Sequence, residues 1–128
     1  MELRGRVATG FGAHARWMTI HAGLYRSTTG VALVPGTLNV VLDSPWCVGP
    51  GALRLEPPEY PVPLSLVPCR IEGIDGFVVR TDKNDRGEGD HPRTVLEIAA
   101  PLRLRQVLGL ADGDTVVVAI DDGHCGRA

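Results

Sequence analysis

Glycine and proline divide this chain into short apolar segments. Its 128 residues include 16 glycines and 10 prolines. Because these two residues form turns and interrupt regular structure, their frequent occurrence along the chain favours several short strands over a bundle of long helices. The sequence therefore predicts a mainly β fold, a small barrel or sandwich with one or two short helices.

Length and charge narrow the class of protein. A chain of 128 residues is long enough for one hydrophobic core, and we expect a single domain over residues 1–122 with a disordered tail over 123–128. No apolar run approaches the length of a membrane span, about 18 residues, and no secretory signal is predicted. The net charge of −2 argues against broad binding to nucleic acids. The sequence thus favours a cytoplasmic globular protein.

Several common catalytic and metal-binding patterns are missing from the sequence. The three cysteines, Cys47, Cys69 and Cys125, include no Cys-x-x-Cys pair, so we expect free thiols and no zinc site. The histidines lack metal-ligand spacing, and no serine lies in a Gly-x-Ser-x-Gly motif. Lys83 is the only lysine and lies outside any phosphate-binding loop motif. Any nucleotide chemistry would therefore use backbone amides, arginine and a metal ion.

Alternation of apolar residues and the positions of turn residues predict the order of the elements. A helix is expected over residues 102–108, beginning at Pro101 and ending at Gly109. Residues 21–34 give a poor signal, within which residues 27–30 are expected to form a loop or a broken helical turn, and the polar residues 81–91 are expected to form a mobile loop. Strands are expected over residues 3–9, 17–20, 36–42, near 53, 64–71, 76–80, 95–99 and 115–120.

Two polar side chains interrupt the predicted strand over residues 36–42. Leu38 and Val40 would share one face, and Thr37 and Asn39 would occupy the first exposed positions of the other, just after a Pro-Gly turn. Neutral oxygen ligands of this kind suit Mg²⁺, which completes its coordination with waters and substrate phosphates. The alternative is that Thr37 and Asn39 are ordinary polar residues at the edge of a strand.

Glu97 is the one charged residue in the apolar segment 95–100. By alternation it shares a face with Val95 and Ala99. One interpretation is that this face is the solvent side of an edge strand. The other is that the carboxylate accepts a proton from a bound alcohol, as a general base does.

Two segments are candidates for binding an anion. Gly10 and Gly12 could let backbone amides approach a phosphate, or they could form a β-bulge. At residues 101–105, the amino end of the predicted helix and the side chains of Arg103 and Arg105 offer further donors. Solvated arginines on an amphipathic helix would give the same pattern.

Taken together, these segments resemble a known family. Residues 5–12 (GRVATGFG), 35–40 (PGTLNV), 96–105 (LEIAAPLRLR) and 110–114 (LADGD) occur in this order, and the chain resembles the archaeal-type CTP-dependent riboflavin kinases through them. The resemblance spans nearly the whole chain. It implies a small six-stranded cradle-loop (RIFT-like) barrel that transfers the terminal phosphate of CTP to the 5′-hydroxyl of riboflavin.

The resemblance also implies roles for individual residues. Thr37 and Asn39 would hold Mg²⁺, and Glu97 would contact the flavin and act as the base. The implied partners are riboflavin and CTP, with no nucleic acid or membrane, and a monomer is expected. Nucleotide contacts are implied for Gly10, Phe11, Gly12, Ala13, His14, Ala15, Arg16, Leu102, Arg103, Leu104 and Arg105.

Other functions remain as alternatives at this point. One is a flavin- or nucleotide-binding module of the same fold that has lost turnover, and another is a kinase with a changed donor or acceptor. Residues 110–116 also occur in swapped-hairpin DNA-binding proteins, although the acidic balance of the chain disfavours that class.

Overall fold

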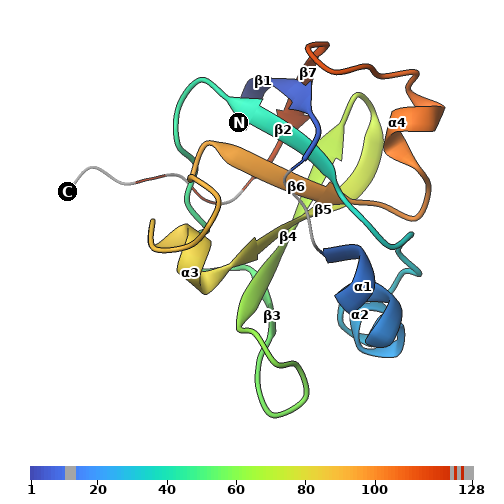
Figure 1. Cartoon of the computed structure of the whole chain (residues 1–128), viewed down its shortest axis with the longest axis vertical. Coiled ribbons are helices and arrows are strands. Elements are labelled where there is room, and N and C mark those ends of the chain that lie inside the picture. Colours follow the sequence, from blue (N-terminus) through green and yellow to red (C-terminus); the bar gives the residue numbers. More distant parts are fainter. Residues whose placement is uncertain (11–13, 122, 124, 126–128) are drawn as a thin grey trace.

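A computed structural model describes residues 1–10, 14–121, 123 and 125 (Figure 1). The described residues form seven strands and four short helices, so the fold is mainly β as predicted. The strands are β1 (Glu2–Ala8), β2 (Leu38–Leu42), β3 (Leu53–Leu55), β4 (Leu64–Ile71), β5 (Ile74–Thr81), β6 (Val95–Ala99) and β7 (Thr115–Ala119). The helices are α1 (His14–Ile20), α2 (Ala22–Thr29), α3 (Asp82–Asp85) and α4 (Leu104–Val107).

Six of the strands close into an antiparallel barrel. Their order is β4-β5-β6-β2-β1-β7, and β7 pairs back with β4 through Arg70↔Ala119 and Ile71↔Val118. The predicted six-stranded barrel is therefore confirmed. β3 stands outside the ring and pairs with β4. β2 and β6, which matter for the candidate site, each lie between two other strands, so neither is at a sheet edge.

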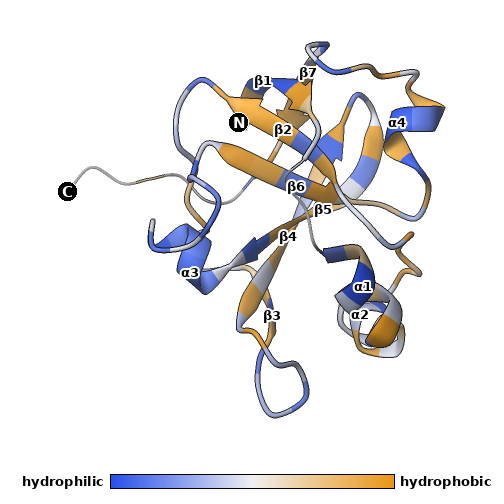
Figure 2. Cartoon of the chain, viewed as in Figure 1, coloured by the Kyte–Doolittle hydropathy of each residue, from blue (hydrophilic) through white to orange (hydrophobic). Residues whose placement is uncertain are grey.

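Alternate residues of the strands fill the barrel. Val40, Leu96 and Ile98 are almost completely buried and belong to one cluster with side chains of β4 and β7. Figure 2 shows β2 and β6 coloured mainly as hydrophobic and α3 as hydrophilic. At Gly5, a Cβ atom would lie 2.6 Å from Val40 Cγ1, so glycine allows β1 and β2 to approach closely.

A second apolar cluster lies outside the barrel, beneath α1 and α2. Met18 of α1 and Tyr25 of α2 are buried against residues of β3 and β4, and the hydroxyl groups of Tyr25 and Tyr60 lie 2.7 Å apart. The prediction of a strand over 17–20 is therefore wrong, and residues 27–29, expected as a loop or a broken helical turn, form the end of the regular helix α2. A run of four residues does not distinguish helix from strand by periodicity, and the burying partners lie far away in the sequence.

None of the helices in the described ranges is long and apolar enough to cross a membrane.

The polar segment over residues 81–91, predicted as a loop, contains the short helix α3. Thr81 caps α3 by accepting a hydrogen bond from the backbone N–H of Asn84 at 3.1 Å, and the Asn84 side chain accepts one from the backbone N–H of His91 at 3.3 Å. The segment is thus folded back on itself.

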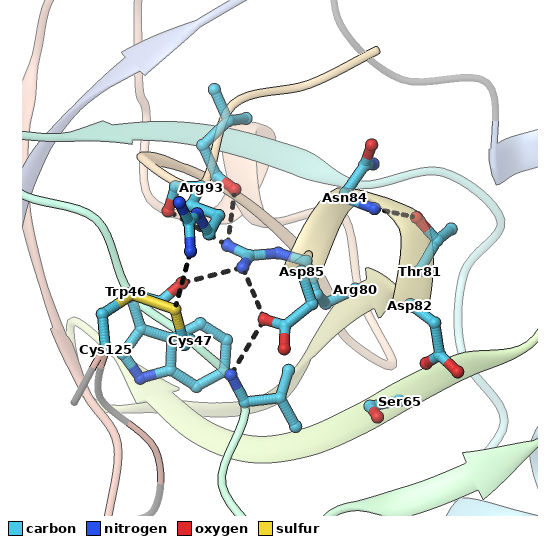
Figure 3. A network of polar contacts seen from close by, with 12 residues as sticks. Trp46, Cys47, Ser65, Arg80, Thr81, Asp82, Asn84, Asp85, Arg93 and Cys125 are labelled. Carbon is cyan, nitrogen blue, oxygen red and sulfur yellow. Dashed lines mark hydrogen bonds and ion pairs between the residues drawn. A yellow bond between two sulfur atoms is a disulfide. The ribbon is translucent and has the colours of Figure 1, made fainter. Parts of the chain in front are cut away.

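Arg80 joins this segment to the barrel. Its side chain is 3% exposed and donates to the carbonyl of Trp46 at 2.8 Å, to Asp85 at 3.0 Å and to the carbonyl of Val95 at 3.1 Å (Figure 3). Burial lowers the pKa of the guanidinium group, and the charge of Asp85 opposes that change. The guanidinium also lies over the Trp46 ring, 5.2 Å from its centre.

The expectation of three free thiols is wrong for two of them. Cys47 and Cys125 form a disulfide across 78 positions of the sequence, beside the Arg80 contacts in Figure 3, whereas Cys69 is a buried free thiol. Spacing alone did not reveal the pair, because the two cysteines meet only once the barrel has formed. The bond ties residue 125 of the predicted disordered tail to the body of the protein.

Breaking this disulfide is expected to reduce stability. Because the bond closes a long loop, its loss should lower the free energy of unfolding by about 2–4 kcal/mol. Urea denaturation of wild type with and without dithiothreitol measures the difference. The double variant Cys47→Ser/Cys125→Ser should match reduced wild type and show no response to dithiothreitol. Equal midpoints for oxidised and reduced wild type would contradict this expectation.

Candidate functional site

Asn39 and Glu97 stand opposite each other on the neighbouring strands β2 and β6. They are paired in the antiparallel register, between the pairs Leu38↔Ile98 and Val40↔Leu96. Since those neighbouring pairs point into the barrel, Asn39 and Glu97 point away from it on the same face. Asn39 is 7% exposed and Glu97 is 4% exposed. Both polar side chains are therefore buried on the outer surface of the barrel wall.

These positions remove two of the alternatives left open by the sequence. Each of β2 and β6 lies between two other strands, so Asn39 is not an edge residue and Glu97 is not on the solvent side of an edge strand. The expectation that Asn39 is exposed is also wrong. Neither burial could be predicted from the alternation pattern, because it depends on what packs outside the barrel.

A cavity of about 220 Å³ adjoins Asn39. Its walls come from the end of β1, from the turn before β2 and from residues 102–105 after β6. Thr37, Asn39, Arg103 and Arg105 all line it, so the structure brings together residues that lie more than 60 positions apart. We call this space the first cavity.

Thr37 and Asn39 present two neutral oxygen atoms to the first cavity. The Thr37 hydroxyl oxygen and the Asn39 Oδ1 atom lie 3.4 Å apart, close to the separation of two adjacent ligands of an octahedral Mg²⁺ ion, about 3 Å. In the described part of the chain, no group of three or more His, Cys, Asp or Glu residues could hold a metal. Two neutral oxygen atoms from Thr37 and Asn39 are a donor set that fits an ion that takes most of its ligands from water and phosphate.

The two arginines of the first cavity differ in their surroundings. Arg105 donates to Asp112 at 2.8 Å, to the Thr9 hydroxyl at 3.3 Å and to the Ala8 carbonyl at 3.4 Å, which tie it to the end of β1. Arg103 is exposed and precedes the first residue of α4. The helix was predicted to begin at Pro101, but it begins at Leu104. The extended backbone at Arg103 is the physical reason.

A second cavity of about 290 Å³ adjoins Glu97. Trp17 and Tyr60 provide aromatic walls, and Thr81, Lys83 and residues 88–91 provide a polar rim. His14 and His91 also line it, one from α1 and one from the segment after α3. The second cavity thus combines flat apolar surface with a buried carboxylate.

Glu97 contacts a histidine at each of its carboxylate oxygens. His91 Nδ1 lies 2.7 Å from Oε1, and His14 Nε2 lies 3.0 Å from Oε2. Burial acts to raise the pKa of Glu97, but the close contacts with the two histidines and their charges outweigh it and hold the pKa below its usual value. Glu97 is therefore a carboxylate at neutral pH and can only accept hydrogen bonds.

Residues 10 and 14–16, which follow β1 and were predicted to bind nucleotide, do not lie together in one cavity of the structure. Gly10 follows β1 and has a φ of +94°, while Phe11, Gly12 and Ala13 lie outside the described residues. His14 faces Glu97 in the second cavity, and Ala15 and Arg16 line a shallow depression with Trp17 on α1. Among those predicted nucleotide contacts that the structure describes, only the ones over residues 102–105 line the first cavity with Thr37 and Asn39.

His91, Trp17 and Tyr60 were not singled out as site residues from the sequence. His91 occurs in a polar segment without a motif, and its partner Glu97 is apparent only once β6 is placed beside that segment. Trp17 was assigned to a strand. An amphipathic pattern linking Met18 and Tyr25, seven positions apart, was the one available signal for a helix there.

Comparisons with known proteins agree with the resemblance noted in the sequence. The family model labelled CTP-dep_RFKase, described as a domain of unknown function, DUF120, matches residues 56–120. A riboflavin kinase of Pyrobaculum islandicum is 32% identical over 140 residues, covering 94% of this chain and 60% of that protein. One of Staphylothermus marinus is 27% identical over 126 residues, covering 95% of this chain and 93% of that protein.

A third relative extends the range of organisms. A riboflavin kinase of Methanosarcina mazei is 33% identical over 138 residues, covering 94% of this chain and 56% of that protein. The chain thus spans about 60% of the length of several curated relatives that it matches, and nearly all of the Staphylothermus marinus protein.

Proposed function

The chain belongs to the CTP-dependent riboflavin kinase family, and we propose that it transfers the terminal phosphoryl group of CTP to the 5′-hydroxyl of riboflavin, giving FMN and CDP. A new bond forms between the riboflavin oxygen and the terminal phosphorus. The bond from that phosphorus to the bridging oxygen of CDP breaks, and the hydroxyl proton is released. We also propose that the reaction takes place in the cytoplasm.

The observation that carries this proposal is the cross-strand pair of Asn39 and Glu97. Asn39 lines the first cavity, Glu97 lines the second, and the two residues are direct neighbours in the sheet. Phosphoryl transfer needs a donor site and an acceptor site that meet at the reacting atoms, with charge neutralisation on the donor side. Two cavities that adjoin at this pair meet that requirement.

The first cavity suits the triphosphate. Arg103 and Arg105 offer forked donors to phosphate oxygens, and Gly36, with a φ of +107°, forms the turn that leads Thr37 into the cavity wall. Thr37 and Asn39 would hold Mg²⁺ there. When bound, the ion neutralises charge on the phosphates.

The second cavity suits the acceptor. Trp17, which is exposed, offers aromatic surface for stacking a planar ring system, and the polar rim suits a hydroxylated chain. Glu97 is ionised and faces this cavity, so it can accept the proton of a hydroxyl group as phosphoryl transfer proceeds.

Incubation of the purified protein with riboflavin and Mg²⁺ tests the function. Each of CTP, ATP, GTP and UTP is supplied separately, and FMN is separated chromatographically. FMN formation with CTP above the other three is expected. Absence of FMN with all four overturns the proposal. Quenching of riboflavin fluorescence without turnover would then indicate the binding-module alternative.

Removing either metal-binding oxygen is expected to weaken use of the metal–nucleotide complex. Each of Thr37→Ala and Asn39→Ala deletes one contact to a charged centre, worth about 1.5–3 kcal/mol, so the Mg²⁺ concentration for half-maximal activity should rise about 10–100-fold. Titration of Mg²⁺ at fixed CTP measures this. Thr115→Ala, at an exposed threonine of β7 that does not line the first cavity, is the matched control. An unchanged Mg²⁺ requirement in both variants would exclude the assigned role.

A further inference from the structure

We propose that His14 and His91 are positioning residues that together orient Glu97 toward the acceptor hydroxyl, an inference that rests on the function proposed above. Neither histidine needs to touch the substrates in this role. Each acts through the carboxylate, which remains the group that takes the proton.

The contacts of Glu97 support a two-point attachment. His91 Nδ1 forms a hydrogen bond with Oε1 at 2.7 Å, whereas His14 Nε2 lies 3.0 Å from Oε2 as a close contact without hydrogen-bond geometry, so each oxygen still has its own histidine neighbour. The terminal torsion of a glutamate side chain is broad, and one contact would leave the carboxylate free to rotate about it. Contacts to both oxygens fix the plane of the group. A carboxylate has about four acceptor positions, so two remain for an incoming hydroxyl.

Burial makes these contacts strong. The side chain of Glu97 is 4% exposed, that of His14 12% and that of His91 20%. The hydrogen bond from His91 and the electrostatic contact of His14 with the carboxylate are both stronger in such surroundings than in water. The donors also come from separate parts of the chain, so the orientation of Glu97 depends on how α1 and residues 82–91 pack against β6.

The segment that carries His91 is itself tightly folded. Asn84 Oδ1 accepts a hydrogen bond from the backbone N–H of His91, and the backbone N–H of Asn84 donates to Thr81. Gly89 passes so close to Asn84 that a Cβ atom at position 89 would overlap the Asn84 side chain. These contacts hold the His91 backbone where its ring reaches Glu97.

The chemical step stays balanced with this assignment. Glu97 accepts the hydroxyl proton while the oxygen–phosphorus bond forms, and the proton leaves to solvent after transfer. The histidines neither gain nor lose a proton in the step. Their contribution is geometric, and a misplacement of the base by about 1 Å is sufficient to cost about 100-fold in rate.

Variants that remove or retain the donor test the inference. His14→Ala, His91→Ala and the volume-filling His14→Leu and His91→Leu lack a donor, whereas His91→Asn and His14→Gln keep an amide N–H near the lost ring nitrogen. We expect the donor-free variants to lower kcat about 10–100-fold with the KM for CTP changed less than about twofold. The amide variants should recover most of the loss. Thr19→Ala on α1 and Arg86→Ala after α3 are the controls, and neither side chain contacts Glu97.

A double-variant comparison separates positioning from general stability. If the histidines act through Glu97, adding His91→Ala to Glu97→Gln should cause no further loss of kcat. Unchanged kcat in all donor-free variants, or a full additional loss in the Glu97→Gln background, overturns the inference while leaving the kinase function intact. Absence of FMN formation by wild type with all four nucleotides overturns the function and the inference together. The leucine and amide variants decide the outcome if an alanine variant does not fold.

Discussion

Replacement of Glu97 with glutamine is expected to slow FMN formation by about 10²–10⁴-fold, the usual contribution of a general base. Glutamine has nearly the same shape but cannot accept the hydroxyl proton at neutral pH. Because the substitution preserves most of the cavity wall, the affinity for riboflavin should remain largely intact. Single-turnover kinetics of FMN formation and fluorescence titration of riboflavin measure the two quantities separately.

The matched control is Glu2→Gln, which neutralises an exposed glutamate on β1. Its turnover should equal that of wild type. Normal turnover in Glu97→Gln would exclude the general-base role. Loss of riboflavin binding without a change in the rate of the bound complex would instead assign Glu97 to acceptor binding alone.

Replacement of Arg80 with alanine is expected to destabilise the protein by about 3–5 kcal/mol, as is usual when one partner of a buried ion pair is removed. Asp85 would lose its charged partner, and the carbonyl groups of Trp46 and Val95 would lose their donor. The same change would release the contact between α3 and the barrel, next to the segment that carries His91. Urea denaturation at neutral pH gives the free energy of unfolding.

Arg70→Ala is the matched control for this variant. Arg70 also pairs with an aspartate, Asp75, but its side chain is 62% exposed, so its loss should have little effect on stability. Arg80→Lys keeps the charge and loses the forked geometry, and it should fall between wild type and Arg80→Ala. A free energy of unfolding for Arg80→Ala equal to that for Arg70→Ala would contradict the role assigned to the buried guanidinium.

The strands of the barrel could be predicted because their local pattern and their final environment agree. The apolar pattern of residues 64–71 and 115–120 predicts strands, and these segments are buried in the barrel. The turns between strands contain the expected glycines. The wrong predictions of secondary structure concern segments whose buried side chains pack against residues far away in the sequence. α1 and α2 are held by an apolar cluster that includes β3 and Tyr60, and no local signal in residues 14–29 reveals that partner.

The candidate site was likewise predictable from the sequence only in part. Thr37, Asn39 and Glu97 stand out in the sequence because polar groups interrupt apolar strands, and that mismatch is local. Their burial, the pairing of Asn39 with Glu97 and the two histidines around the carboxylate depend on strand order and on the packing of α1. His91 could not be connected with Glu97 by spacing, because hydrogen bonds within residues 81–91 decide where its ring lies.

Local chemistry was therefore sufficient to identify strand formation, the polar positions within the strands and the family resemblance, since each depends on residues close together in the chain. Barrel closure, the Cys47–Cys125 disulfide and the environment of Glu97 were decided by tertiary structure. The physical reason is that burial and electrostatic environment are properties of the neighbours a side chain acquires on folding. For Glu97 those neighbours come from three separate segments of the chain.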